Sequence, residues 1–468
     1  MSSVGRPVIV FAIVILAGFA LLSYSLYSSL NKGYEGPLKV VPSDPSVPSC
    51  SDCNVVLVTV EATRADHLDL YGYHRRTMPL LAGYARDGVV FDRAYSQAPW
   101  TKPSMASLHT SLYSFRHGAV FGLYDSYMED SAVTLAEKLS GAGLKTAGFV
   151  TISNVKSDFG FSQGFDHFDE TNVFDRRAMI VNGEVKKWLS DNRGERFFLW
   201  VHYLDPHDPY MPPLTFNIYW NKSYAGDVKP HSELRGLEMK KCMGNLSCRL
   251  DYSPADIQHM KDFYHGELRY TDFAIDDLFS HISGLGISNK TMVILTSDHG
   301  QEFMDHDLMG HGSSLYDEQV HVPLIVWAPG LEPGRVSRLT GLIDIYPTIL
   351  SFVGSKVPEG IDGRDLFGSG HDFLITENYL PPRAKKALIT EDYKLILSTY
   401  PDGNNVTELY PTGRDPSESA DLSLEMPDKA AKMTALLDSV VTEVGANQSS
   451  REVDDETLRH LQSLGYIL

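Results

Sequence analysis

The chain has 468 residues, of which 43% are hydrophobic and 22% are charged. This length suits one large domain with a smaller partner, and the composition excludes a wholly disordered, collagen-like or multi-spanning membrane protein. Sixty acidic against 41 basic residues give a net charge of -19, which disfavours binding to nucleic acid and nonspecific attraction to anionic lipid. An anionic substrate would therefore need a metal ion or a local cationic pocket.

Residues 1–30 contain a long apolar run. Residues 8–22 carry no charge, and the apolar character continues to Tyr27, which makes about 20 residues, enough to span a bilayer. The alternative is a cleaved signal peptide, whose apolar region is usually shorter and is followed by small residues. Because this run ends in Tyr24, Tyr27 and Leu30, an uncleaved, single-pass membrane anchor is the favoured interpretation.

The next segment, residues 31–53, is rich in Gly, Pro and Ser and is expected to be a linker. Four cysteines occur as two close pairs, Cys50/Cys53 and Cys242/Cys248, and outside the cell they allow three disulfide pairings. Five N-x-S/T sequons fit a glycoprotein with an extracytoplasmic body. They are Asn221, Asn245, Asn289, Asn405 and Asn447.

Residues 54–370 alternate between strand-like and helix-like patterns. The strand-like runs are 54–60, 145–152, 196–204, 291–297 and 322–327, and the helix-like runs are 78–87, 131–139 and about 254–283. Nearly continuous β-branched runs are typical of strands buried on both faces. This alternation predicts an α/β fold with a mostly parallel central sheet sandwiched by helices.

Residues 371–468 follow a different pattern. Short strand-like runs at 373–376 and 393–399 are separated by Pro, Gly and Asn turns and lead into an acidic, helix-leaning tail. We expect a smaller C-terminal α+β subdomain and tail.

Three reactive side chains follow two of the predicted strands. Glu61 ends the first strand, and Asp298 and His299 follow the run at 291–297. Because reactive groups in an open parallel sheet gather past the carboxyl ends of the strands, these side chains are candidates for one metal site. Carboxylate oxygens with an imidazole nitrogen favour zinc or manganese, with calcium as a further possibility.

A hydroxyl stands where another helix should begin. Pro103 suits the first turn of a helix, which places Thr101 at or beside the N-cap. There it would face the free backbone N–H groups and the positive helix end, which is the kind of site that holds a phosphate or sulfate. The alternative is that Thr101 only caps the helix.

Long motifs that recur in order from about residue 54 to 410 resemble the sulfatase family of the alkaline phosphatase superfamily. The first runs from NVVLVTVEATRADHLDLYGY to the segment APWTKPSMASLHTS. Others are FFLWVHYLDPHDPYMPP (197–213), YHGELRYTDFAIDDL (264–278), TMVILTSDHGQEF (291–303), GHGSSLYDEQVHVPLIVWAPG (310–330) and GLIDIYPTILSFVG (341–354).

The resemblance implies a role for each matched residue. Glu61 falls where the family has an Asp metal ligand, Asp298 and His299 fall on a second metal-ligating pair, and Thr101 falls on the nucleophile, which also borders the metal. The family therefore implies one divalent metal ion held by these four residues.

Four further residues are expected to contact the substrate. His207 and His311 match positions at which the family contacts the transferred group. His306 and Lys102 are additional candidates, although Lys102 has the alternative of a solvated loop residue. His202 lies inside a buried-looking strand and is interpreted as structural.

The chain departs from the sulfatase pattern at the nucleophile. Sulfatases carry C-x-P-x-R or S-x-P-x-R, in which the Cys or Ser becomes formylglycine, whereas this chain has Thr101 and, in the Arg position, Met105. A Thr cannot give an aldehyde by the same oxidation. Glu61 together with Thr101 instead looks like the membrane-anchored phosphoethanolamine and phosphoglycerol transferases of the superfamily.

The favoured hypothesis is a sulfatase-like, metal-dependent hydrolase that cleaves sulfuric or phosphoric esters through Thr101. The alternatives are a membrane-anchored transferase of the type just named and a non-catalytic binder of sulfated or phosphorylated glycans or lipids. The expected partner is thus a sulfated or phosphorylated small molecule, glycan or lipid. Selectivity is expected to reside in loops such as 215–248, and the sequence does not predict an oligomeric state.

Overall fold

The computed structural model describes residues 47–119, 126–171, 177–229, 251–379, 384–400, 402–441 and 459. The expected membrane anchor, Cys242, Cys248 and the sequons at Asn245 and Asn447 lie outside these residues. Among the described residues, no helix is both long and apolar enough to cross a membrane.

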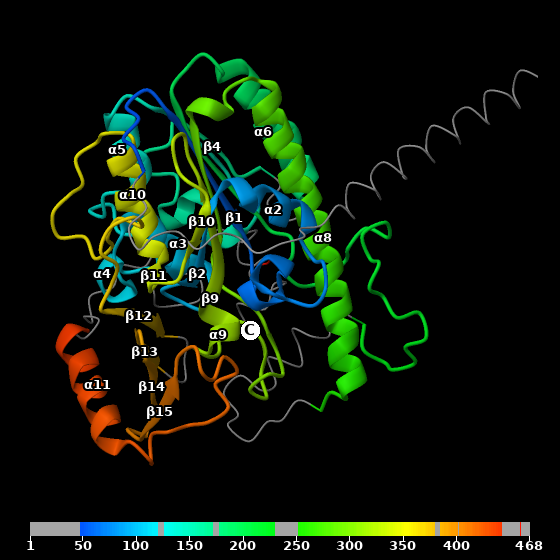
Figure 1. Cartoon of the computed structure of the whole chain (residues 1–468), viewed down its shortest axis with the longest axis vertical. Coiled ribbons are helices and arrows are strands. Elements are labelled where there is room, and N and C mark those ends of the chain that lie inside the picture. The colour runs from blue at the N-terminus through cyan, green and yellow to red at the C-terminus, as the bar shows by residue number, and fades with distance from the viewer. Residues whose placement is uncertain are drawn as a thin grey trace, which may run out of the picture.

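A nine-stranded sheet forms the centre of the molecule (Figure 1). Its strand order is β10-β2-β9-β6-β1-β5-β3-β4, and β11 also pairs with β2. The central strand β1 (Asn54–Val60) lies between β5 (Phe197–Tyr203) and β6 (Thr291–Ser297) and is parallel to both. The other strands are β2 (Val89–Tyr95), β3 (Lys145–Phe149), β4 (His167–Asp169), β9 (His321–Trp327), β10 (Gly334–Val336) and β11 (Thr340–Gly341).

The orientation of β9 differs from that of its neighbours. This strand is antiparallel to both β2 and β6, whereas β1, β3, β4, β5 and β6 run parallel to one another. A continuous apolar run such as HVPLIVW shows burial on both faces but carries no information on strand direction. The predicted mostly parallel sheet is therefore confirmed, with an antiparallel strand inserted between β2 and β6.

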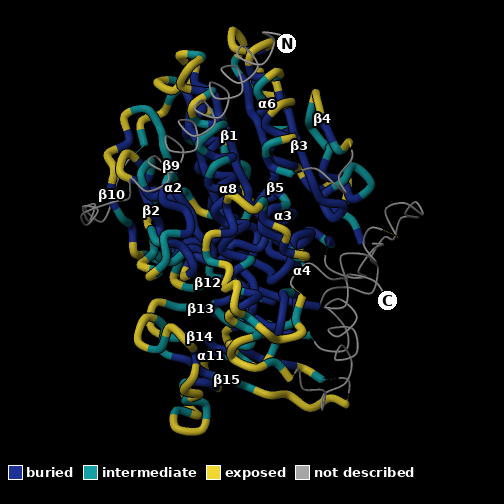
Figure 2. Tube along the Cα trace, turned by 90° about the vertical axis from the view of Figure 1, so that its right-hand side faces the viewer, coloured by how far each residue is buried: buried dark blue, intermediate teal, exposed yellow. Residues whose placement is uncertain are grey.

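Both faces of the sheet are covered by helices. Along β1, Val55 and Leu57 belong to one apolar core, and Val56 and Val58 belong to the core on the opposite face, as the alternation of strand side chains requires. One face packs against α3 (Thr101–Thr110), α5 (Leu135–Gly141) and α10 (Ile345–Phe352), and the other against α2 (Pro79–Tyr84), α6 (Ala178–Asn192) and α8 (Pro254–Gly284). Figure 2 shows these buried layers in dark blue.

Capping residues determine where the helices begin. The predicted helix at 131–139 in fact starts at Leu135, because Thr134 accepts from the backbone N–H of Glu137 while the Glu137 carboxylate accepts from that of Thr134. The same capping box, with Ser253 and Asp256, starts α8 close to the predicted residue. Shorter elements are α4 (Ser114–His117), α9 (Asp317–Val320), β7 (Glu302–Phe303) and β8 (Met309–Gly310).

Short 3-10 helices join these elements. Within the described residues they span Ala65–His67, Asp69–Tyr71, Ala85–Asp87, Ser153–Val155, Ser157–Phe159, Ser288–Lys290 and Leu342–Asp344. The predicted helix at 78–87 is therefore two pieces, α2 followed by the 3-10 turn Ala85–Asp87.

In its described residues, the C-terminal subdomain is a four-stranded antiparallel sheet with one helix (Figure 1). It contains β12 (Phe373–Asn378), β13 (Ala384–Thr390), β14 (Tyr393–Thr399), β15 (Asn405–Pro411) and α11 (Pro427–Val440). Lys394 of β14 is fully buried, and its Nζ lies 2.7 Å from an Asp317 oxygen and 2.9 Å from a Glu418 oxygen. This ion pair fixes the subdomain against α9 of the larger domain.

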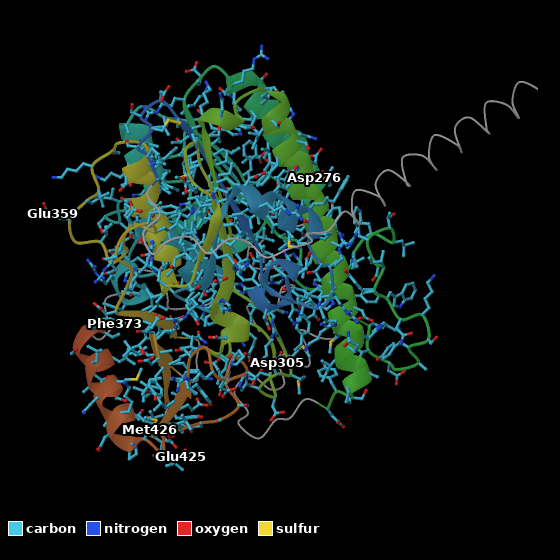
Figure 3. All side chains as sticks on the ribbon, viewed as in Figure 1. Asp276, Asp305, Glu359, Phe373, Glu425 and Met426 are labelled. Atoms are coloured by element: carbon cyan, nitrogen blue, oxygen red, sulfur yellow. A yellow bond between two sulfur atoms is a disulfide. The ribbon has the colours of Figure 1, made fainter. Side chains whose placement is uncertain are left out.

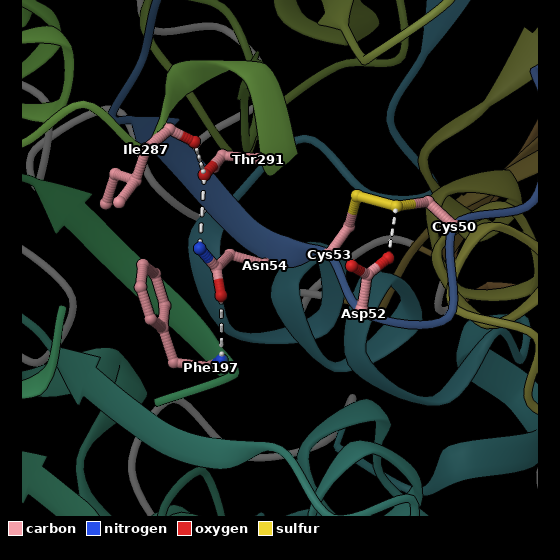
Figure 4. The surroundings of a disulfide bond; sticks show 7 residues. All are labelled: Cys50, Asp52, Cys53, Asn54, Phe197, Ile287 and Thr291. Carbon is pink, nitrogen blue, oxygen red and sulfur yellow. Dashed lines mark hydrogen bonds between the residues drawn. A yellow bond between two sulfur atoms is a disulfide. The ribbon is translucent and has the colours of Figure 1, made fainter. Parts of the chain in front are cut away.

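A disulfide joins Cys50 and Cys53 directly before β1 (Figure 4), which selects one pair among those the sequence allowed. Beside it, the Asn54 amide donates to Thr291 Oγ1 at 3.3 Å and accepts from the backbone N–H of Phe197 at 3.2 Å. One side chain thus aligns the starts of β1, β5 and β6, and this alignment sets the level at which the three strands end.

Candidate active site

Two strand ends and one helix start bring the predicted catalytic residues together. Glu61 follows β1, and Asp298 and His299 follow β6, whose register pairs Ser297 with the last residue of β1. Thr101 is the first residue of α3. All four side chains are fully buried. We call Glu61, Thr101, Asp298 and His299 the site cluster.

The distances in the site cluster are those of direct contact. The Thr101 hydroxyl donates to Glu61 Oε1 at 2.6 Å. The His299 Nε2 atom lies 3.5 Å from Thr101 Oγ1 and 3.3 Å from Glu61 Oε1. The same nitrogen is 3.3 Å from Asp298 Oδ2. The sequence prediction that these four residues converge therefore agrees with the structure.

Neighbouring groups fix the orientation of each ligand. Asp298 Oδ1 accepts from the backbone N–H groups of Ala62 and His299, at 3.0 and 2.9 Å. His299 Nδ1 lies 2.8 Å from the Gly300 carbonyl and donates to it, which leaves Nε2 facing the cluster. The hydroxyl of Tyr264, a residue of α8, donates to the Ala62 carbonyl at 2.9 Å and so holds the turn after β1 in place. Ala62 itself has φ +48°, a conformation that L-residues rarely adopt without such support.

One oxygen in the site cluster has no hydrogen-bond partner. Asp298 Oδ2 is buried and accepts no hydrogen bond, although a buried carboxylate oxygen without a donor is costly. The ligand atoms of Glu61, Asp298 and His299 lie within 4.8 Å of one another. Two carboxylates, an imidazole nitrogen and a hydroxyl therefore fit a divalent cation, and the donor set suits zinc or manganese.

The pKa shifts show how strongly these charges interact. Burial and the nearby Glu61 carboxylate raise the pKa of Asp298 to about 6. Burial alone would raise the pKa of Glu61, but hydrogen bonds from His202 and His299 outweigh it and hold the pKa well below its usual range. Burial opposes a charge on His299, yet the Asp298 and Glu61 carboxylates raise its pKa to about 9. The cluster thus attracts positive charge.

His202 is part of this site, although the sequence analysis treated it as structural. Its Nε2 lies 2.7 Å from Glu61 Oε2, and both side chains are fully buried. Its position in the sequence could have indicated this, because His202 lies one residue before the carboxyl end of β5, the strand paired with β1. In an otherwise apolar strand, an imidazole at that end faces the same edge as Glu61.

His207 and His311 lie next to the site cluster. The ring centroids of His299 and His311 are 4.4 Å apart, and those of His311 and His207 are 4.9 Å apart. His311 Nδ1 lies 2.7 Å from Gln301 Oε1, whose amide nitrogen donates to the Tyr210 hydroxyl at 2.7 Å. Burial and the charge of His299 hold the pKa of His311 well below its usual range, so at neutral pH this residue acts as a neutral hydrogen-bonding group.

Lys102 has its side chain engaged by other residues. Its Nζ donates to the Ser126 carbonyl at 3.1 Å and stands 3.6 Å from the centroid of the Phe159 ring. The side chain is buried, which excludes the alternative of a solvated loop lysine.

His306 also contacts residues outside the site cluster. Its two ring nitrogens contact a Glu318 oxygen and the Glu418 carbonyl, and its ring stacks on Tyr316 at 3.6 Å. The nearby Asp305, labelled in Figure 3, pairs with Arg64 at 2.8 Å. These contacts tie the loop after β6 to its surroundings, so the structure gives His306 a supporting position rather than one among the four cluster residues.

Comparisons with known proteins agree with this geometry. A family model described as Sulfatase matches residues 53–355. Arylsulfatase K from Homo sapiens is 26% identical over 481 residues, covering 88% of this chain and 87% of the relative, and arylsulfatase K from Bos taurus is 24% identical over 479 residues, covering 88% and 86%.

Solved structures show the same fold. One, determined in complex with its substrate D-glucosamine-2-N,6-O-disulfate, gives a TM-score of 0.69 at 19% identity and covers 83% of this chain and 97% of its own. The phosphonate monoester hydrolase of Agrobacterium radiobacter gives a TM-score of 0.66 at 19% identity and covers 86% and 100%. Because the family model spans well over half of the sequence, the chain belongs to the sulfatase family and is an ester hydrolase of that family.

Proposed function

We propose that the protein is a metal-dependent hydrolase that cleaves sulfuric or phosphoric esters with Thr101 as its nucleophile. The observation that carries the proposal is the 2.6 Å hydrogen bond from the Thr101 hydroxyl to Glu61 Oε1, next to the unpartnered Asp298 Oδ2. The Thr101 hydroxyl contacts a buried carboxylate at the start of a helix. This arrangement suits attack on the sulfur or phosphorus atom of an anionic ester.

The first step forms a covalent ester on the protein. Thr101 Oγ1 bonds to the sulfur or phosphorus atom while the bond to the leaving oxygen breaks. Glu61 Oε1, which accepts a hydrogen bond from Thr101, takes the Thr101 proton, and this proton is passed on to the leaving oxygen, so that the product is an alcohol. Backbone N–H groups at the start of α3 suit the negative charge on the other ester oxygens, and His207 and His311 lie beside the cluster.

A divalent cation bound by Glu61, Asp298 and His299 would lower the pKa of the Thr101 hydroxyl and balance the charge on the transferred group. In the second step, water attacks the same sulfur or phosphorus atom, and the bond to Thr101 Oγ1 breaks. Thr101 regains its proton, and sulfate or phosphate leaves.

The substrate class follows from the relatives. Relatives named arylsulfatase K and a neighbour solved with a disulfated glucosamine support sulfate esters of aryl groups or sugars. Thr101 favours the second candidate, phosphoric esters, because a threonine cannot supply the aldehyde on which formylglycine sulfatases depend. The phosphonate monoester hydrolase neighbour agrees with phosphorus chemistry in this fold.

The setting of the reaction is a further part of the proposal. The long apolar run at 8–22 supports a single-pass anchor, and the Cys50–Cys53 disulfide supports an extracytoplasmic body. The substrate would then be a sulfated or phosphorylated molecule outside the cytoplasm. Fractionation of cells that express the full chain, with protease protection of residues 54–370, tests this placement.

An ester panel tests the reaction and the nucleophile together. The purified full-length chain is incubated with an aryl sulfate, an aryl phosphate and an aryl phosphodiester, quenched in acid and digested. The proposal predicts turnover of at least one ester and an adduct on the peptide that contains Thr101. Turnover with an adduct elsewhere would contradict the nucleophile, transfer to an added alcohol would show a transferase, and binding without turnover would show a non-catalytic binder.

A further inference from the structure

A line of buried hydrogen bonds ends on the first carboxylate of the site cluster. Trp200 Nε1 lies 3.0 Å from Thr59 Oγ1, Thr59 Oγ1 lies 2.6 Å from His202 Nδ1, and His202 Nε2 lies 2.7 Å from Glu61 Oε2. All four residues are fully buried. Two adjacent strands build the line, since the β1–β5 register pairs Thr59 with His202.

The indole of Trp200 fixes which atom donates and which accepts in every hydrogen bond of this line. An indole N–H can only donate, so Thr59 Oγ1 accepts from Trp200 and has its own hydrogen to give. The hydroxyl has two acceptors in reach, His202 Nδ1 at 2.6 Å and the Val201 carbonyl at 3.5 Å. The shorter contact is a normal hydrogen bond, whereas the longer one lies at the limit of such bonds. Thr59 therefore donates to Nδ1 of His202.

This assignment places the imidazole hydrogen on the far nitrogen. Because Nδ1 of His202 accepts, the neutral ring carries its hydrogen on Nε2 and donates it to Glu61 Oε2. The other oxygen of Glu61, Oε1, accepts from the Thr101 hydroxyl. The two oxygens of Glu61 are thus separated in role, one directed to His202 and the other to the nucleophile and the cation site.

We propose that His202, oriented by Thr59 and Trp200, is a positioning residue that makes Glu61 a one-oxygen metal ligand. The proposal rests on the proposed function only for the presence of a divalent cation. By occupying Oε2, His202 prevents the carboxylate from rotating to bind the cation with both oxygens, and it keeps Oε1 within reach of Thr101. Groups behind a ligand commonly act in this way, and their loss costs about 10- to 100-fold in metal affinity.

The surroundings favour a strong effect. His109 of α3 packs edge-on against Trp200 with ring centroids 4.2 Å apart, and both residues are buried. Water therefore has no access to replace the His202 hydrogen bond when it is removed, and in a medium of low dielectric the bond is worth more than in water. Glu61 would be left with a buried, unpartnered oxygen that competes for the cation in the wrong geometry.

A pair of amide substitutions tests the position of the donor. In His202→Gln the side-chain amide reaches about as far as Nε2, whereas in His202→Asn it reaches only about as far as Nδ1. The full-length protein is stripped of metal, and Zn²⁺ or Mn²⁺ affinity is measured by competition with a chromophoric chelator. We expect His202→Gln to bind within about 3-fold of the wild type and His202→Asn to bind about 10- to 100-fold more weakly.

A third variant protects the test against misfolding. Thr59→Val keeps the shape of the side chain but removes the hydroxyl that orients His202, and we expect an intermediate loss of affinity, about 3- to 10-fold. Circular dichroism and the melting temperature without metal check that each variant is folded. Equal loss in the Gln and Asn variants, or unchanged affinity in the Asn and Val variants, would overturn the proposal.

The ester panel separates this inference from the proposed function. A wild-type protein that turns over esters while His202→Asn keeps full metal affinity contradicts the positioning role alone. A wild-type protein that binds the cation with the expected dependence on residue 202 but cleaves no ester contradicts the hydrolase alone. A wild-type protein that binds neither Zn²⁺ nor Mn²⁺ contradicts both.

Discussion

Two neighbouring groups of acidic residues and histidine behave very differently in this molecule. Both include residues of the loop after β6, and in both the side-chain ligand atoms lie within 4.8 Å of one another, as a metal ion would need. The first is the site cluster, with Glu61, Asp298 and His299 as its proposed metal ligands. The second, which we call the support cluster, consists of Glu302, His306 and Glu318.

The support cluster already has donors for its acceptors. Glu302 Oε1 accepts from the backbone N–H groups of His306 and Leu308, at 2.9 and 3.2 Å. Glu302 Oε2 accepts from the Ser314 hydroxyl at 3.2 Å and from the Gln319 amide at 2.8 Å. Both nitrogens of His306 are engaged as well. A cation would have to displace these bonds, so the support cluster holds the loop in place.

The site cluster leaves an acceptor without a donor. Asp298 Oδ2 is buried and accepts no hydrogen bond within the described residues, although His299 Nε2 lies 3.3 Å away. Residue types therefore do not distinguish the proposed metal site from the support cluster, because each combines two carboxylates with one imidazole. The number of acceptors that the protein itself leaves unsatisfied makes the distinction.

The largest expected effect is that of removing the nucleophile. We expect Thr101→Ala to lower kcat by at least about 10³-fold, because the covalent step has no other hydroxyl on Glu61 Oε1. Thr101→Ser, which keeps the hydroxyl, should retain measurable turnover. Steady-state kinetics on the best ester of the panel measure both, and a fully active alanine variant would remove Thr101 from the mechanism.

The next largest effect is expected from a substitution at Asp298, whose Oδ2 atom accepts no hydrogen bond. Asp298→Asn replaces a charged ligand by a neutral amide at a nearly constant shape, and we expect metal affinity to fall by about 100-fold or more, with activity falling in parallel. Chelator competition gives the affinity. Unchanged affinity would mean that the cation does not lie against Asp298.

The matched control is the corresponding change in the support cluster. Glu302→Gln turns one accepting oxygen into an N–H donor that faces existing donors, so we expect a loss of about 1–3 kcal/mol in the free energy of unfolding. Metal affinity should stay within about 3-fold of the wild type. Urea unfolding and chelator competition measure the two quantities, and a loss of metal with unchanged stability would reverse the roles of the two clusters.

The smallest effect is a pH dependence of stability that originates in the support cluster. Burial opposes the charge of His306, but the hydrogen bond and charge of Glu318 raise its pKa to about 9. A raised pKa gives stability that is complete below the unfolded value of about 6.5 and is lost as the pH rises through 9. Since the side chain is only partly buried, we expect about 1 kcal/mol from this source.

The same pH series in His306→Gln isolates that contribution. The variant should lose less unfolding free energy than the wild type between pH 6.5 and 9, because a neutral amide does not titrate. Parallel urea unfolding curves at these two pH values make the comparison. An identical decline in both proteins would show that His306 is not charged in the folded state.

Much of the fold could be predicted because buried strands and helices leave recognisable apolar patterns in the sequence. The apolar run at 54–60 gave β1 residue by residue, and the long periodic segment at 254–283 gave α8 within one residue of its end. β13 and β15 were missed, since AKKALIT and NVTELYP mix charged or polar residues with apolar ones and so lack a continuous apolar run. The direction of β9 depends on its neighbours, which lie far away in sequence.

The site was predictable where a residue stands at a strand end. The convergence of Glu61, Asp298 and His299 was predicted in this way, whereas the proposed role of His202 depends on the β1–β5 register and on the tautomer that Thr59 imposes. No linear pattern encodes either. His306 shows the converse, because its residue type suggested a site while its partners, Glu318 and the Glu418 carbonyl, come from a helix and a loop that only the fold brings near.

The most direct test is to locate the cation. Crystals of the full-length protein, soaked in Zn²⁺ or Mn²⁺, would be measured at the absorption edge of the metal. We predict one strong anomalous peak bounded by Glu61, Asp298 and His299, next to Thr101, and none in the support cluster. A peak between Glu302, His306 and Glu318, or an empty site cluster under saturating metal, would contradict it.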